Sequence, residues 1–219
     1  MSSQTQENYL KCIYQICEMN TDGASTNSIA EKIDTKAATV SDMLKKLALK
    51  KLINYQKYQR VTLTAKGKKA ALSILRNHRL WEVFLVDKLS FRWDEVHELA
   101  EQLEHIKSEA LIERLDQFLG QPKFDPHGDP IPNKDGKIAQ NNNIALSTAS
   151  IGKKLVISGV LEHSDEFLSH LNQINLVLGQ KIVVKSINDF DRSMQLNINK
   201  KEHLFISHQV AKNILVICQ

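Results

Sequence analysis

Histidine and carboxylate side chains recur at helical spacing between residues 78 and 105, and such side chains can bind a metal ion. They form two sets, each on one face of an expected helix: His78 and Glu82, then His97, Glu101, Glu104 and His105. No thiol lies among them. Carboxylates and imidazoles suit a divalent first-row ion such as Mn(II) or Fe(II), whereas structural zinc sites usually include cysteine. The segment therefore predicts a metal site.

An ordinary solvated helix explains the second set equally well. Val96, Leu99, Ala100, Leu103 and Ile106 mark the buried face of that segment. Charged residues would occupy the opposite face of such a helix in any case. These residues alone leave both interpretations open, and the rest of the chain has to decide between them.

Size and composition are those of an ordinary globular chain. Its 219 residues exceed one typical domain, so we expect two or three. No apolar run approaches the length of a membrane span, and no charged leader precedes an apolar segment, so we expect a cytoplasmic protein. The three cysteines, Cys12, Cys17 and Cys218, form no CxxC motif and do not imply disulfides.

The net charge of +4 is distributed unevenly along the chain. Residues 1–79 contain fourteen basic and six acidic side chains, a balance of +8. Residues 80–140 contain seven basic and thirteen acidic side chains, a balance of −6, and the remainder has a balance of +2. A basic first third joined to an acidic segment is typical of a nucleic-acid-binding domain followed by a domain with another role.

The first third has the element order of a winged helix-turn-helix. Three helices are expected, over residues 4–19, from Ser25 or Thr26 onward, and after the break at residues 34–36. Two β-prone runs at residues 52–55 and 61–64 then enclose a basic tip, which predicts a hairpin. A plain three-helix bundle would explain the helices but not this hairpin. A long helix capped by Thr64 follows and continues to about residue 87.

Small and polar residues at the start of the third helix permit close approach to the major groove of DNA. Hydroxyl and carboxylate side chains there can reach base edges, and lysines can neutralise phosphates. The expected DNA contacts are Thr26, Asn27, Lys36, Ala38, Thr39, Ser41, Asp42 and Lys46 on the helices, with Lys57 and Arg60 in the wing.

Residues 80–119 contain more large apolar side chains than a small domain would expose, which predicts a dimer interface. These side chains are Leu80, Trp81, Val83, Phe84, Leu85, Phe91, Trp93, Leu111, Leu115, Phe118 and Leu119.

All four prolines lie between residues 121 and 143, in a stretch with turn chemistry that predicts a linker, ordered in its first half. Asp125 and His127 within it are either additional ligands or turn residues.

From residue 151, five β-prone runs and one helix at residues 165–173 predict a small bent sheet or barrel. His163 and Glu166 are the only candidates in this part for reaching the acidic cluster.

Three function classes fit these residues. A metal-activated regulator uses both the basic first third and the acidic cluster, whereas a metal-independent winged-helix regulator that senses a small molecule uses only the former. A metal-dependent hydrolase needs an open coordination position and a base in a pocket. We find no candidate base, no phosphate-binding glycine loop and no HExxH motif in the sequence, so we expect no enzyme.

The order of the parts and five motifs resemble the diphtheria toxin repressor and manganese transport regulator family of metal-dependent transcriptional repressors. The motifs are Glu7-Asn8-Tyr9-Leu10, His78-Arg79-Leu80-Trp81-Glu82, Val96-His97, Glu101-Gln102-Leu103-Glu104-His105, and the run from Asp125 to Pro132. The resemblance covers nearly the whole chain and is most specific through residue 132.

The resemblance implies a mainly α protein with small β parts. It implies a winged helix-turn-helix DNA-binding domain at residues 1–74, a helical dimerisation and metal-binding domain at residues 75–140, and an SH3-like (FeoA-like) domain at residues 148–219. It further implies a homodimer that binds a palindromic operator in double-stranded DNA when a divalent metal is bound, and so represses metal-uptake genes.

The resemblance also implies two metal sites when it is carried over position by position. The regulatory site would be formed by Glu101, Glu104 and His105, with Asn8 from the N-terminal helix. The ancillary site would be formed by His78, Glu82 and His97, completed by His163 and Glu166 from the C-terminal domain. Asp125 and His127 match a motif that supplies ligands in some members, and His78 fits either site.

Three positions depart from individual branches of the family. Asn8 stands where relatives have Asp or Met. Lys11 stands where the short manganese regulators have a carboxylate, which argues against a two-metal site of their type. Glu101 stands where iron-sensing members have Cys, and the loss of that soft sulfur favours Mn(II), with Fe(II) as second choice.

The expected mechanism is a population shift. Without metal, Glu101, Glu104 and nearby carboxylates repel one another and leave the helix that carries Asn8 loosely placed. Metal removes the repulsion and ties this helix to the dimer core. The two recognition helices are then held at the spacing of successive major grooves.

Overall fold

A computed structural model describes residues 3–140, 142–198 and 202–218. The chain divides into two compact units. The first contains Met1–His78, Glu101–Ile112 and Pro132–Ile138, and the second contains Arg79–Ala100, Glu113–Ile131 and Ala139–Gln219. Helices predominate, and the strands form one small hairpin and one six-stranded sheet. The expected fold class, mainly α with small β parts, is confirmed.

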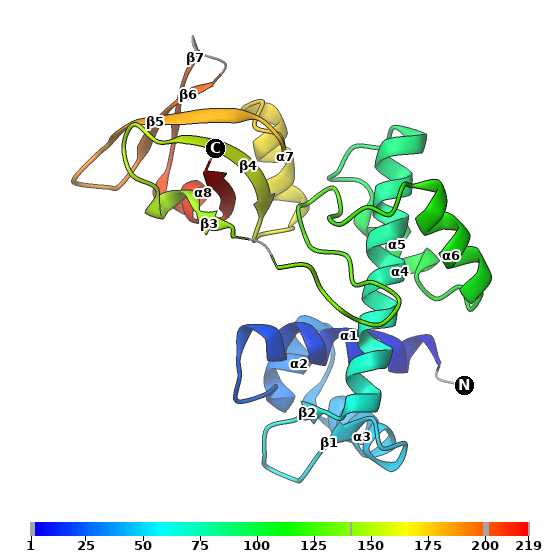
Figure 1. Ribbon diagram of the computed structural model, residues 1–219. Coiled ribbons are helices and arrows are strands. Elements are labelled where there is room, and N and C mark those ends of the chain that lie inside the picture. The colour runs from blue at the N-terminus through cyan, green and yellow to red at the C-terminus, as the bar shows by residue number, and fades with distance from the viewer. Residues whose placement is uncertain (1–2, 141, 199–201, 219) are drawn as a thin grey trace. The chain divides into compact units, whose positions relative to one another are not determined.

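Three helices and a hairpin begin the first unit, in the order that the sequence predicts. They are α1 (Gln4–Met19), α2 (Thr26–Lys32), α3 (Ala37–Leu49), β1 (Ile53–Asn54) and β2 (Thr62–Leu63), and the long helix α4 (Ala65–Leu89) follows (Figure 1). Ser25 caps α2 in a reciprocal capping box with Ser28. The Thr64 hydroxyl accepts the Gly67 N–H at 3.1 Å and caps α4.

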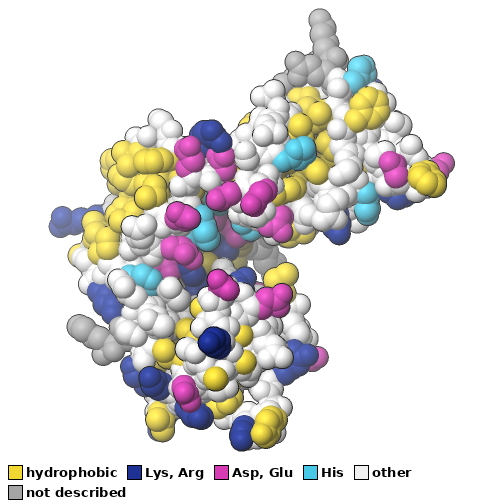
Figure 2. All heavy atoms as spheres, turned by 180° about the vertical axis from the view of Figure 1, so that it is seen from behind, with side chains coloured by type: hydrophobic (Ala, Val, Ile, Leu, Met, Phe, Trp, Pro, Cys, Tyr) yellow, Lys and Arg dark blue, Asp and Glu magenta, His cyan; other side chains and the backbone are white. Residues whose placement is uncertain are grey.

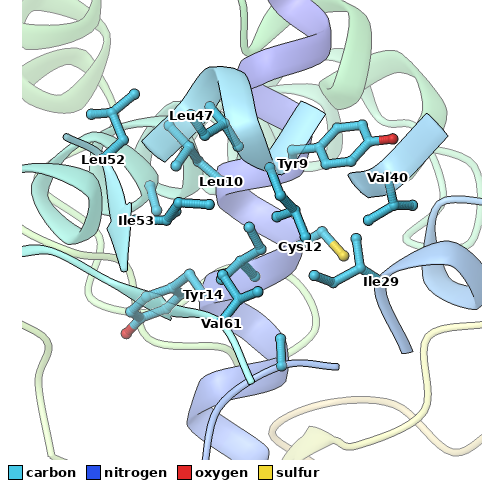
Figure 3. Close-up of a cluster of buried hydrophobic side chains, with 14 of the residues drawn as sticks. Tyr9, Leu10, Cys12, Tyr14, Ile29, Val40, Leu47, Leu52, Ile53 and Val61 are labelled. Carbon is cyan, nitrogen blue, oxygen red and sulfur yellow. The ribbon is translucent and has the colours of Figure 1, made fainter. Parts of the chain in front are cut away.

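One apolar core joins these helices to the hairpin. Figure 3 shows side chains of α1, α2, α3 and the hairpin pointing toward one another, among them Leu10, Ile29, Leu47 and Val61. Each of these four is at most 1% exposed. The helical spacing of the apolar residues on α1 and α3 therefore corresponds to the faces that are buried.

The hairpin is fastened to the turn that precedes α2. Val61 and Ala24 exchange two backbone hydrogen bonds of 2.8 and 2.9 Å. Gly23 beside them has φ +99°, and a Cβ there would lie 2.7 Å from the Val61 carbonyl oxygen, so only glycine fits without strain. The wing is thus positioned by the same turn that starts the helix-turn-helix.

Helix α5 (His97–Leu103) ends earlier in the sequence than the spacing of the histidines and carboxylates predicts. It is followed by a turn that the Ile106 N–H closes on the Leu103 carbonyl at 3.1 Å, and α6 (Glu109–Phe118) begins after it. Glu104 and His105 therefore lie in the turn. The expectation that they share one helical face with His97 is wrong, because the helix ends before them.

The C-terminal part forms an antiparallel six-stranded sheet. Its elements are β3 (Ile144–Ala145), the 3₁₀ helix η1 (Leu146–Thr148), β4 (Lys154–Val160), α7 (Asp165–Gln173), β5 (Lys181–Ile187), β6 (Met194–Ile198), β7 (Glu202–Ile206), α8 (His208–Lys212) and β8 (Ile214–Cys218). The strand order is β3-β8-β4-β5-β6-β7. Irregular register in β4 near Gly159 and in β5 near Ser186 bends the sheet.

Helix α7 and alternate strand residues build the core of this sheet domain. Leu168 and Leu171 of α7 pack with inward-facing residues of β4, β5, β6 and β8. The helix expected at residues 165–173 is α7, whereas β3 and α8 were not expected. No helix within the described ranges is long and apolar enough to cross a membrane.

Shortening a core side chain of α3 tests the first unit. Leu44 is 0% exposed, so Leu44→Ala should lower the free energy of unfolding by about 2–5 kcal/mol through lost burial and the cavity left behind. Urea denaturation measures the change. Leu49→Ala on the same helix, where the side chain is 84% exposed, is the matched control and should change it by less than about 0.5 kcal/mol. Equal losses in the two variants would contradict the packing described.

Candidate metal centres and DNA interface

The first cluster, which we call the α1 cluster, lies where α1 meets the turn after α5. Glu104 is at its centre, with a side chain that is 0% exposed. Its Oε2 lies 2.7 Å from Lys11 Nζ and 2.7 Å from His78 Nδ1. Lys11 Nζ also lies 3.2 Å from Glu101 Oε1. The cluster thus joins α1, α4 and the turn through one buried carboxylate.

His105 is oriented by Glu7 of α1. Its Nδ1 lies 2.8 Å from Glu7 Oε2, and Lys107 Nζ approaches Glu7 Oε1 at 3.2 Å. When Nδ1–H donates to a carboxylate, the lone pair of a neutral imidazole is on Nε2, which is the form that binds metals. His105 Nε2 lies 3.7 Å from Glu104 Oε1. Glu7 therefore orients a candidate ligand whose Nε2 faces the Glu104 carboxylate.

Two candidate ligands have a buried acceptor atom that lacks a hydrogen-bond donor. They are Glu104, through Oε1, and Asn8 of α1, through Oδ1. A buried acceptor without a donor costs free energy, and a cation bound at the Glu104 carboxylate would satisfy its Oε1. The surrounding donors are carboxylate and amide oxygens and an imidazole nitrogen, the types that divalent first-row ions accept. The residues of the α1 cluster therefore fit a divalent cation.

Lys11 has a larger part in this cluster than its sequence position suggests. Its side chain is 9% exposed and reaches both Glu101 and Glu104. Sequence reasoning identified Lys11 only as a residue that cannot be a ligand while charged. Its ammonium already offsets part of the repulsion between Glu101 and Glu104, which we expected to be unopposed without metal.

The second cluster, which we call the loop cluster, lies in the second unit. One ligand atom from each of Glu82, Asp125 and His127 lies within 4.8 Å of the others, and all three residues are buried. Glu82 Oε1 is 3.7 Å from His127 Nδ1 and 3.6 Å from Nδ1 of His97, whose side chain is 48% exposed. Figure 2 shows acidic and histidine side chains gathered on one face of the molecule.

Asp125 is both a turn residue and a candidate ligand. Its Oδ1 accepts the backbone N–H groups of His127 at 2.8 Å and Asp129 at 2.9 Å, which forms the turn. Its Oδ2 lies 3.3 Å from Arg79 Nε. Arg79 also contacts Asp129 Oδ2 at 2.7 Å and donates to the Pro130 carbonyl at 2.6 Å. Arg79 of α4 thus fixes the loop that carries Asp125 and His127.

Charges within the loop cluster shift its protonation. Burial raises the pKa of Asp125 to about 7, with Glu82 and Asp129 adding to the effect and Arg79 opposing it. Burial alone would lower the pKa of His127, but the Glu82 carboxylate outweighs it and raises the pKa to about 9. The Glu82 carboxylate thus favours the protonated form of His127.

The sheet domain brings one of its two candidate ligands to the loop cluster. The His163 ring lies edge-on to His127 at 5.3 Å, and His163 Nε2 is 3.8 Å from Asp129 Oδ2. That nitrogen is buried and has no hydrogen-bond partner, and burial lowers the pKa of His163. Glu166 is exposed on α7 and is not among the grouped ligand atoms.

His78 belongs to the first unit and contacts Glu104 there, whereas Glu82 and His97 belong to the second. Of the candidate ligands, the α1 cluster contains His78, Glu101, Glu104 and His105, and Asn8 directly follows Glu7 on α1. The loop cluster contains Glu82, His97, Asp125, His127 and His163.

The expected DNA contacts lie on the surface of the first unit. Lys36, Ala38, Thr39, Asp42 and Lys46 are exposed at the start and outer face of α3, and Asn27 is exposed in the first turn of α2. Thr26 and Ser41 are partly exposed, and the Ser41 hydroxyl donates to the Ala37 carbonyl at 3.0 Å. In the wing, Lys57 is exposed, and Arg60 donates to the Gly23 carbonyl at 3.1 Å.

Sequence reasoning did not identify the residues that orient these sites. Glu7, Lys107, Arg79 and Trp93 are the main examples. The Trp93 carbonyl lies 2.8 Å from His127 Nε2, and the Trp93 indole donates to Asn172 at 2.6 Å. Glu7 and Arg79 lie within motifs that carry candidate ligands, which is the one signal that could have identified them.

Removing the Arg79 charge tests the anchoring of the loop. Arg79→Met leaves the buried Asp125 without its guanidinium partner and should lower the free energy of unfolding by about 3 kcal/mol. Thermal unfolding in EDTA measures the loss. Lys45→Met, which removes an ion pair with Asp42 that is exposed on both sides, is the control and should leave the melting temperature nearly unchanged. An unchanged melting temperature in Arg79→Met would show that the loop does not depend on this contact.

Three family models cover most of the chain. The model described as iron dependent repressor, N-terminal DNA binding domain, matches residues 1–61. The model described as iron dependent repressor, metal binding and dimerisation domain, matches residues 64–133, and the FeoA domain matches residues 144–218.

Similar proteins agree with these models. The iron-dependent repressor IdeR of Mycobacterium tuberculosis is 36% identical over 128 residues, which are 58% of this chain and 55% of that protein. The diphtheria toxin repressor of Corynebacterium jeikeium is 31% identical over 131 residues, 60% of this chain and 54% of that protein. The chain thus spans about half the length of these curated relatives.

Solved structures match over nearly the whole length. A manganese-dependent transcriptional repressor in complex with manganese has a TM-score of 0.88 and 34% identity, covering 98% of this chain and 100% of that one. ScaR with bound Zn²⁺ has a TM-score of 0.78 and 32% identity, covering 98% and 99%. The winged helix-turn-helix, the helical dimerisation domain and the SH3-like sheet domain are those of one family. The chain therefore belongs to the diphtheria toxin repressor and manganese transport regulator family of metal-dependent transcriptional repressors.

Proposed function

We propose that this protein is a transcriptional repressor that binds palindromic operator DNA as a homodimer when a divalent metal occupies the α1 cluster. The observation that carries the proposal is the buried Glu104 carboxylate, whose Oε1 lacks a donor, in a cluster that also holds His105 oriented by Glu7. A metal-independent regulator would have no use for this arrangement.

We propose Mn(II) as the physiological metal, with Fe(II) as second choice. Glu101, Glu104, Asn8 and His105 offer oxygen and imidazole donors, and the absence of a thiol among them favours a hard cation. Relatives named as iron-dependent and structures named as manganese-dependent repressors are both similar to this chain, which keeps the two metals as the leading candidates.

Residues from two parts of the first unit would share the regulatory ion. Asn8 comes from α1, whereas Glu101, Glu104 and His105 come from α5 and the turn after it. A bound divalent ion supplies positive charge shared among these donors. Glu7 keeps His105 Nε2 available as a ligand, and His78 steadies Glu104. Binding therefore favours the arrangement in which α1 is held against the turn.

We assign the loop cluster to an ancillary metal. Glu82, Asp125 and His127 would be its main ligands, with His97 and His163 close enough to complete it after small movements. Glu166 would need a larger change, because it is exposed on α7. Since His163 comes from the sheet domain, this ion would join that domain to the loop.

The two α3 helices of the homodimer would read half-sites one helical turn apart. Exposed apolar side chains of the second unit provide a surface for pairing: Leu89 is 52%, Phe91 38% and Phe118 65% exposed. A patch of exposed hydrophobic side chains is visible in Figure 2.

We place the domain boundaries near residues 74 and 140. We expect the repressor to be cytoplasmic and to act on metal-uptake genes.

Disabling the α1 cluster should abolish metal control of DNA binding. Wild type should bind promoter fragments of metal-uptake genes at least 10-fold more tightly in Mn(II) than in EDTA, a difference of about 1.4 kcal/mol. Glu104→Ala combined with His105→Ala removes two ligands and should reduce this ratio to near one. Electrophoretic mobility shifts at fixed salt measure both affinities.

Glu98→Ala is the matched control for that experiment, because Glu98 is exposed on α5 and should leave the ratio unchanged. A double variant that keeps the full metal dependence would refute the assigned site. Equal DNA binding by wild type in Mn(II) and EDTA would instead favour a metal-independent regulator.

Two residues of α3 should differ in how they affect DNA recognition. Lys46→Ala removes a phosphate-neutralising charge, so it should weaken binding to all sequences and reduce the slope of log affinity against log salt by about 1. Thr39→Ala should instead relax the preference at one base pair, by about 1–3 kcal/mol. Salt titrations on matched and mutated operators separate the two effects. Lys212→Ala, at an exposed lysine of α8 in the sheet domain, is the control. A loss from Lys212→Ala equal to that from Lys46→Ala would contradict the assigned interface.

A further inference from the structure

Lys11 lies on the same face of α1 as the residues that serve the α1 cluster. Glu7 is four positions before it and Asn8 is three, so all three side chains lie on one side of the helix. Glu7 contacts His105, and Lys11 contacts Glu101 and Glu104. Helix α1 thus brings an anion, a neutral acceptor and a cation to one short segment of chain.

The ammonium of Lys11 bonds to carboxylates that we assign to the metal. Its Nζ is 2.7 Å from Glu104 Oε2 and 3.2 Å from Glu101 Oε1. A divalent ion bound by the same two carboxylates would lie a few ångströms from this ammonium. Like charges at such separations repel strongly inside a protein, where screening is weak. Lys11 and a metal therefore cannot both keep these contacts without a large cost.

Burial makes this competition effective. The Lys11 side chain is 9% exposed and Glu104 is 0% exposed, so neither charge is well solvated. A cation attached to the chain is present at a high effective concentration and cannot be diluted away. Metal binding must therefore overcome the existing ion pairs, which lowers the apparent affinity of the site.

We propose that Lys11 is a tethered cation that competes with the metal for Glu101 and Glu104, and so sets the metal concentration at which the regulatory site fills. This inference rests on the proposed function of that cluster. It makes the switch an exchange of cations, in which Lys11 leaves the carboxylates as the metal arrives.

The test compares Glu82→Gln with the double variant Glu82→Gln plus Lys11→Met, so that the loop cluster lacks one ligand in both proteins; below, the Glu82→Gln protein is the reference. Mn(II) affinity is measured by calorimetric titration, and the melting temperature is measured in EDTA and in Mn(II). Lys11→Met keeps the length of the side chain and removes its charge. We expect its Mn(II) dissociation constant to fall at least 10-fold. In EDTA its melting temperature should fall, because Glu104 then lacks its ammonium partner, and Mn(II) should raise it by more than in the reference protein.

Lys50→Met is the matched control. Lys50 also contacts α1, through Gln6 Oε1 at 2.6 Å, but that partner is neutral. Lys50→Met lowers the net charge by the same amount as Lys11→Met. Because Lys50 does not contact Glu101 or Glu104, Lys50→Met should leave the Mn(II) affinity and the two melting temperatures near those of the reference protein. A gain in affinity equal to that of Lys11→Met would mean that overall charge is responsible, and would overturn the proposal.

Further variants keep the proposal falsifiable if Lys11→Met does not fold. Lys11→Gln removes the charge while keeping a donor and should shift affinity in the same direction, whereas Lys11→Arg keeps the charge and should stay near the reference protein. Unchanged or weaker Mn(II) binding in the neutral variants would overturn the tethered cation alone. A reference protein that binds no Mn(II) would overturn the proposed function as well.

Discussion

A buried carboxylate is the constraint on which the first unit depends. Glu104 has no solvent to stabilise its charge, so the fold must supply partners for it. Lys11 arrives from α1 and His78 from α4, while Asn77 donates to the Glu104 backbone carbonyl at 3.1 Å. Segments distant in sequence therefore meet at one side chain. One of these segments, α1, also forms part of the core of the DNA-binding domain, so the proposed change of charge at Glu104 would act on that core.

The loop cluster solves a similar electrostatic problem with a different residue. Arg79 holds Asp125 and Asp129 with its planar guanidinium and also donates to a backbone carbonyl. Such a multidentate contact is geometrically specific, whereas a lysine ammonium is a point charge on a flexible stem. The difference suits their roles, because Arg79 supports a loop that should stay in place and Lys11 supports carboxylates that must change partners.

Much of this organisation could be predicted from the sequence because it follows local rules. The apolar spacing of α1, the cap at Ser25 and the alternation of β5 and β6 are properties of short segments, and the helix and strand bounds follow from them. The end of α5 at Leu103 could not be predicted in this way. Glu104 and His105 continue the helical spacing, and long-range contacts with α1 and α4 place them in a turn instead.

The candidate ligands were identified from residue types, spacing and family resemblance, but the residues that orient them were not. Lys11, Glu7 and Arg79 act on residues that lie between 46 and 98 positions away, and periodicity carries no information about such pairs. Lys11 illustrates the limit well. Its charge excluded it as a ligand, yet only the three-dimensional contacts indicate what the charge does.

The loop at residues 125–130 also touches strand β4 through its backbone. The His127 carbonyl accepts the Val160 N–H at 3.0 Å, and a Cβ on Gly128 would lie 2.1 Å from the Ser158 carbonyl oxygen. A main-chain contact this close fixes the backbone of the loop to strand β4, which lies inside the sheet between β8 and β5. Because of these contacts, His127 and β4 should move together. The C-terminal sheet domain would therefore help to position a ligand of the proposed ancillary site.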